Sequence, residues 1–200
     1  MIITKDPFNK PKKKLKTLTK LIFKIMKTKT IILYQFSELS EKAKQKAIEK
    51  LFDINVDFDW WEGIYDDAEQ IGLKLKYFDL NSNKHCIGEF ISSALECSEL
   101  IMHNHGETCD TYKTASKYIK DYEDLVTKYS DGINTAKVAE GNASGFDYEA
   151  DNLEEEFLES ILKDYATILQ NEWDYLQSEK AIIETIEANE YWFDENGNLE

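Results

Sequence analysis

The stretch from about Asp147 to Gln177 constrains the fold most, because it predicts one long helix with an apolar face and an acidic face. Its apolar side chains recur at spacings of three and four, which places them on one arc of a helical wheel. They are Leu153, Phe157, Leu158, Ile161, Leu162, Tyr165, Ile168, Leu169 and Leu176. The other side carries Glu155, Glu156, Glu159, Lys163, Gln170, Asp174 and Gln177. We therefore expect a helix that covers a core and exposes an acidic surface.

Charge is divided unevenly along the chain. Residues 1–30 contain ten lysines and the single acid Asp6, a balance of +9, so the total of −15 leaves −24 for the other 170 residues. Residues 141–200 alone contain 17 acids and two lysines. Such a body repels nucleic acids and anionic membranes, so we expect no direct nucleic-acid binding by it and a partner protein with a basic surface. The alternative is that the acidity only keeps the protein in solution.

Length and composition predict the organisation. We expect a basic N-terminal extension over residues 1–29 and a single acidic domain over residues 30–200, a length that buries a core without metal or disulfides. All cations are lysines, and without arginine's bidentate fork, specific reading of bases is disfavoured. The cysteines, an odd number without CxxC spacing, indicate reduced thiols in a cytosolic protein; they are Cys86, Cys97 and Cys109. No apolar run approaches the length of a transmembrane segment.

Residues 10–29 form a basic block in which lysines alternate with apolar residues at spacings of three and four. This pattern predicts a short basic amphipathic helix, which could bind an anionic membrane, a nucleic acid, or the acidic body of its own or another copy. The alternative is that Met26 is the natural start and that residues 1–25 are an upstream extension with little function.

The remaining pattern predicts an α+β domain that is predominantly helical, with a small antiparallel sheet. Residues 73–80 and 84–91 are extended runs separated by turn-forming residues, so they predict a β-hairpin, with residues 30–36 as a third strand. Further helices are expected from Ser37 or Ser40 to about Asp53, from Asp57 and Asp59 to Gly72, over residues 92–105 and 111–129, and after Ser178. Residues 130–145 are expected to form an irregular loop, since they contain three glycines and little apolar periodicity. Of Trp60 and Trp61, we expect one in the core and one half-covered.

One cluster has metal-ligand chemistry. His103, His105, Glu107 and Cys109 alternate, so in an extended strand they would share one face and could converge on zinc. The periodicity instead places them at a helix end, where residues two apart diverge and a histidine favours the negative end of the dipole. No phosphate-binding glycine loop, nucleophile elbow or HExxH motif is present. We therefore predict no catalytic residues, no metal, no cofactor and no enzymatic activity.

Several runs carry a family resemblance that covers about residues 26–200. They are YQFSELSEKAKQKAIEKL, WWEGIYDDAEQIGLKLKYFDL, GEFISSALECSELIMHNHGETCDTYKTA, YSDG and EEEFLESILKDYATILQNEWDYLQSE. The chain resembles a group of uncharacterised phage and prophage proteins, some of which are labelled as the antitoxin of a toxin–antitoxin stability system. This resemblance implies a phage-encoded protein in the cytoplasm of a bacterial host, and it transfers no catalytic residues.

Resemblance and charge together predict a non-enzymatic protein that binds and inhibits a host defence effector, of the anti-CRISPR or anti-restriction type, by occupying a basic surface. The expected partner-binding residues are Glu155, Glu156, Glu159 and Asp174. Alternatives are an antitoxin, a metal-binding or small-molecule-binding protein with a site near His103, His105 and Cys109, and a phage assembly component. A homo-oligomer is compatible with each.

Overall fold

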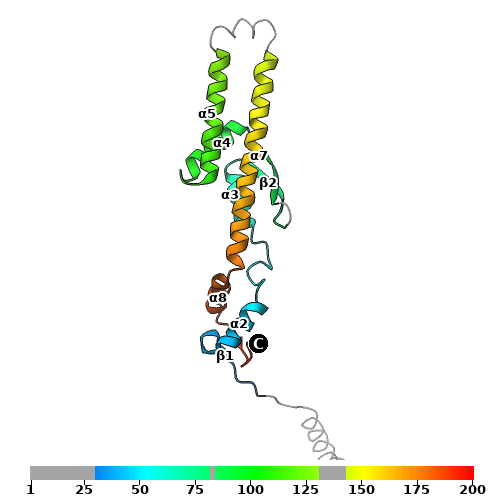
Figure 1. The fold of residues 1–200 in the computed structure, drawn as a ribbon, viewed down its shortest axis with the longest axis vertical. Coiled ribbons are helices and arrows are strands. Elements are labelled where there is room, and N and C mark those ends of the chain that lie inside the picture. The colour runs from blue at the N-terminus through cyan, green and yellow to red at the C-terminus, as the bar shows by residue number, and fades with distance from the viewer. Residues whose placement is uncertain (1–29, 82–83, 131–142) are drawn as a thin grey trace, which may run out of the picture. The chain divides into compact units, whose positions relative to one another are not determined.

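The computed structural model describes residues 30–81, 84–130 and 143–200 (Figure 1). Their contacts define two compact units: one contains the described residues up to Ala47 together with Glu190–Glu200, and the other is Ile48–Asn189. The predicted N-terminal extension, with its basic helix, lies outside the described residues. Two contact units need not fold independently, so a single domain over residues 30–200 stays a prediction.

The larger unit is built on α7 (Ala143–Leu176), the long helix that the sequence predicts from about Asp147. Residues 143–145 belong to this helix and not to the predicted loop, and residues 131–142 of that loop lie outside the described residues. Phe157, Ile161, Tyr165 and Leu169 are buried on its apolar face. α5 (Asp110–Ser130) lies beside α7 in Figure 1. The two helices are antiparallel, because residues early in α5 contact the middle of α7, whereas residues late in α5 contact its first turns. Tyr118 of α5 stacks on Phe157 with ring centroids 4.4 Å apart.

The predicted hairpin is confirmed as β2 (Leu73–Asp79) and β3 (His85–Phe90), which pair antiparallel from Leu73 opposite Phe90 to Asp79 opposite His85. Gly72 precedes β2 with a φ of +78°, the left-handed conformation that ends the preceding helix. β3 packs against α7 at Gly88, where an added Cβ would lie 2.6 Å from the Lys74 carbonyl oxygen and 2.9 Å from Leu162 Cδ2. The hairpin is thereby fixed on α7.

The prediction that residues 30–36 add a third strand to this hairpin is wrong. β1 (Tyr34–Gln35) instead pairs antiparallel with β4 (Trp192–Phe193), and each sheet in the described part of the chain has two strands. Phe36 packs on Phe193 with ring centroids 6.2 Å apart, so the C-terminal aromatic run supplies the pairing partner. The chain turns after β4, where Gly197 has a φ of +75°.

The remaining helices confirm a predominantly helical α+β fold. They are α2 (Glu41–Lys50), α3 (Glu62–Gln70), α4 (Ala94–Asn104) and α8 (Glu179–Ala188), with the short 3-10 helix η1 (Phe36–Glu38) before α2. Ser93 and Ser178 accept hydrogen bonds from Glu96 N and Ala181 N and so cap α4 and α8. α3 starts later than Asp57 and Asp59 predict, because residues 51–59 form successive turns that bring Trp60 into the core. Trp61 is half-buried, as expected for the pair.

Candidate functional site

The predicted partner-binding residues occupy one side of α7 at two separate levels. Glu155, Glu156, Glu159 and Asp174 are all exposed. The first three lie within little more than one helical turn, whereas Asp174 follows Glu159 by about 22 Å along the axis at a rise of about 1.5 Å per residue. Lys163, also exposed, lies between the two levels. The structure therefore brings three of the four carboxylates together and separates the fourth.

The ion pairs of Lys113 and Lys117 of α5 lie within that helix, although Lys117 also interacts electrostatically with Glu156. Lys113 pairs with Asp110 at 2.7 Å, and Lys117 pairs with Asp121 at 2.9 Å, both within α5. In the part of the chain that the structure describes, no lysine lies within ion-pair distance of Glu155, Glu156, Glu159 or Asp174. Their charges remain available to a partner.

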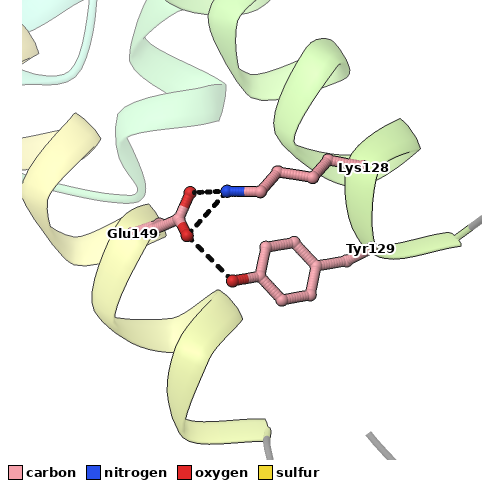
Figure 2. Close-up of polar contacts among 3 residues, drawn as sticks. All are labelled: Lys128, Tyr129 and Glu149. Carbon is pink, nitrogen blue, oxygen red and sulfur yellow. Dashed lines mark hydrogen bonds and ion pairs between the residues drawn. The ribbon is translucent and has the colours of Figure 1, made fainter. Parts of the chain in front are cut away.

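One α7 carboxylate has a structural role instead (Figure 2). Lys128 Nζ lies 2.8 Å from Glu149 Oε1 and 2.5 Å from Oε2, and the Tyr129 hydroxyl donates to Oε1 at 2.9 Å. Lys128 lowers the pKa of Glu149, and the hydrogen bond from Tyr129 lowers it further. Both donors come from the last turn of α5 and the acceptor from the second turn of α7, so this contact joins the two helices near their connected ends.

A second polar cluster joins α3, the end of α4, α5 and α7. Tyr165 of α7 donates to Asp67 Oδ2 of α3 at 2.7 Å, and His105 Nδ1 lies 2.7 Å from Thr111 Oγ1. His105 Nε2 lies 3.6 Å from Asp67 Oδ1, within ion-pair range but beyond a good hydrogen bond. His105 lowers the pKa of Asp67, partial burial opposes this shift, and the Tyr165 hydroxyl adds to the lowering. Thr111 is buried, so its hydroxyl is a structural partner of the imidazole.

This cluster borders a cavity of about 460 Å³. Most of its lining residues are polar or acidic and none is lysine, although much of the lining surface is carbon: Asp67, Asn104, His105, Gly106, Cys109, Asp110, Thr111, Asp164, Thr167, Ile168 and Asn171. Asp164 accepts a hydrogen bond from Thr114 at 2.6 Å, yet desolvation raises its pKa. Of the three residues named for an alternative site, His105 and Cys109 line the cavity and His103 does not.

The predicted helix end at His103–Cys109 is confirmed, since α4 ends at Asn104. Within the described residues, no three His, Cys, Asp or Glu side chains are grouped to hold a metal ion. Sequence reasoning missed Asp67 and Tyr165 as parts of this cluster. Tyr165 carries only an apolar signal in the helical pattern, and the contact with Asp67 joins residues 98 positions apart.

Comparison with known proteins identifies no relative: no family model, no curated protein and no solved structure matches the chain. Among the helices that the structure describes, none combines the length and apolar character needed to cross a membrane.

Proposed function

We propose that this chain is a phage-encoded acidic protein that inhibits a host defence effector, such as a restriction or CRISPR nuclease, by occupying its basic nucleic-acid-binding surface. The observation that carries the proposal is the group of exposed carboxylates Glu155, Glu156 and Glu159, none of which forms an ion pair with a described lysine, on a helix whose other face is buried. The phage setting comes from the family resemblance.

The charge density of this part of α7 supports the proposal. Residues 151–159 contain five carboxylates, Asp151, Glu154, Glu155, Glu156 and Glu159, along about 12 Å of helix axis at a rise of about 1.5 Å per residue. This is about one negative charge per 2.4 Å, against about one per 1.7 Å for duplex DNA. All of α7 carries ten acids and one lysine over 34 residues, a much lower density. Imitation of a nucleic acid therefore belongs to the 151–159 segment.

Packing fixes the helix backbone from which these carboxylates project. Phe157 is buried within the segment, against Tyr118 of α5 and Phe90 of β3, and the Lys128–Glu149–Tyr129 contact lies two turns earlier on α7 (Figure 2). Because the helix is already formed and packed, binding need not order its backbone. Long-range attraction between these carboxylates and a basic groove would also speed association.

A competition experiment tests the proposal. Purified defence nucleases with labelled DNA bound are titrated with the full chain, and we expect displacement of DNA at near-stoichiometric concentration. The variant with Glu155→Gln, Glu156→Gln and Glu159→Gln should need at least about ten-fold more protein, a loss of about 1.4 kcal/mol. A control with Glu99→Gln, Glu123→Gln and Glu187→Gln removes the same charge from exposed positions on three other helices and should behave as wild type.

Two results would contradict the proposal: DNA remaining bound to every nuclease in the panel, or equal displacement by the triple variant and the wild type. Tight binding to a small toxin of the same host, without effect on nucleases, would favour the antitoxin alternative.

The cavity beside His105 and Cys109 supports a second candidate function, the binding of a small molecule. Its volume of about 460 Å³ is in the range of ligand pockets. A saturable rise in unfolding temperature with a small polar ligand, lost in His105→Ala, would favour this function.

A further inference from the structure

The connection between α2 and α3 is firmly attached although it forms only turns. Asn55 is 7% exposed, donates from Nδ2 to the Leu176 carbonyl oxygen at 3.0 Å, and accepts from Thr185 Oγ1 at 2.6 Å. Trp60 is also buried and packs on Trp173 with ring centroids 5.5 Å apart. These contacts hold residues 52–59 at the C-terminal end of α7 and the side of α8.

Two phenylalanines in this anchored connection face solvent. Phe52 is 52% exposed and Phe58 is 62% exposed. Asn55 and Trp60 are buried and hold this segment in place. The exposure of the two phenylalanine rings is therefore not a result of a poorly packed segment. Single exposed apolar residues are common, but two large rings on one anchored segment of the chain fit an interaction surface.

Acids surround both rings in sequence. Asp53 follows Phe52, and Asp57 and Asp59 flank Phe58; all three carboxylates are exposed. Residues 51–73 contain seven acids and no lysine. The attachment of Asn55 to Leu176 and of Trp60 to Trp173 also brings exposed Asp174 to this region. An apolar centre with a charged rim is the usual anatomy of a protein interface, and here the rim is negative.

We propose that Phe52 and Phe58 are the apolar anchors of a docking surface for a basic partner protein, on which lysines and arginines surround an apolar hollow. Asp53, Asp57, Asp59 and Asp174 form its acidic rim. This inference rests on the proposed function and deepens it: the 151–159 segment supplies charge, and the Phe52/Phe58 surface supplies a contact that does not depend on charge. It also gives Asp174 a role separate from that of the three glutamates.

The test uses the full chain and two synthetic peptides of equal positive charge. One contains lysine with glycine and serine, and the other places leucine among the lysines at spacings of three and four. We expect the leucine-containing peptide to bind Phe52→Ser/Phe58→Ser at least about ten-fold more weakly than wild type, a loss typical of interface hot spots. The lysine–glycine–serine peptide should bind both proteins equally.

Tyr148→Ser provides a matched control, because Tyr148 is a 69% exposed aromatic residue on α7, outside the segment that carries Phe52 and Phe58. It should bind both peptides as wild type does, and unchanged unfolding temperatures would show that every variant is folded. Equal affinity of wild type and Phe52→Ser/Phe58→Ser for the leucine-containing peptide would overturn the inference. So would a dimer of the wild type in light scattering that the double variant loses, since the occupant would then be a second copy.

Failure of this inference can be separated from failure of the proposed function. If the Phe52→Ser/Phe58→Ser variant still displaces DNA from a nuclease as wild type does, while the Glu155/Glu156/Glu159 variant does not, the docking inference fails and the inhibitory function stands. If no nuclease is inhibited but the two peptides are distinguished as expected, the function fails and the docking surface stands.

Discussion

At the scale of single residues, the three cysteines differ in environment. Burial raises the pKa of Cys86 to about 11 and that of Cys97 to about 12, so both stay protonated near neutral pH. Cys109 is exposed at the rim of the cavity. We predict that one thiol per chain reacts rapidly with a disulfide reagent in the native protein and that all three react after unfolding. Cys109→Ser should abolish the rapid phase; fast reaction of a second thiol would contradict the described packing.

Asp67 gives the fold a pH-dependent contribution to stability. Its pKa in the folded protein is lowered, mainly by His105, so its charged form stabilises the fold above its unfolded pKa of about 3.9. This contribution is lost as the pH falls through the lower, folded value. Urea unfolding should therefore show that Asp67→Asn costs most stability near pH 6 and progressively less below about pH 4. Asp66→Asn, an exposed neighbour, is the control; the same pH trend in both would refute a specific role for Asp67.

Among the secondary-structure elements, β3 has no room for a side chain at Gly88, between Lys74 of β2 and Leu162 of α7. A Cβ there would meet the Lys74 backbone oxygen at 2.6 Å, which cannot rotate away as a side chain can. We predict that Gly88→Ala lowers the free energy of unfolding by about 1–3 kcal/mol, the usual cost of overpacking. Gly63→Ala in α3 is the matched control, because its Cβ would meet no atom within 4 Å. Gly63→Ala should raise the free energy of unfolding by about 0.5–1 kcal/mol. Denaturant titration would measure the free energy of unfolding of both variants.

Local sequence patterns predicted where the helices and strands lie better than they predicted which of them pair with one another. The α7 periodicity, the Ser178 cap and the Gly72 stop each act over a few residues, so the sequence shows them directly. The pairing of Tyr34 with Phe193 joins opposite ends of the chain, and no local signal distinguishes it from pairing with the hairpin. The turns over residues 51–59 also depend on distant contacts, since Asn55 bonds to Leu176 and Thr185.

At the scale of the whole molecule, the candidate site was only partly predictable. Helical periodicity sufficed to place Glu155, Glu156 and Glu159 on an exposed face, because one helix carries all three. It could not show that Asp174 lies nearer to the Phe52–Asp59 segment, which tertiary contacts bring to the end of α7. The cavity beside His105 likewise requires α3, α4, α5 and α7 together.

The proposed function requires that the organised negative charge of α7 recognises a basic surface on a partner protein. The most direct measurement is the dissociation constant of the full chain for an inhibited nuclease as a function of salt concentration. Between about 0.1 and 1 M salt the Debye length falls from about 10 Å to about 3 Å. We expect the affinity of the wild type to fall steeply over this range, and that of the Glu155→Gln, Glu156→Gln, Glu159→Gln variant to depend less on salt. Affinity independent of salt, with equal slopes for the two proteins, would contradict it.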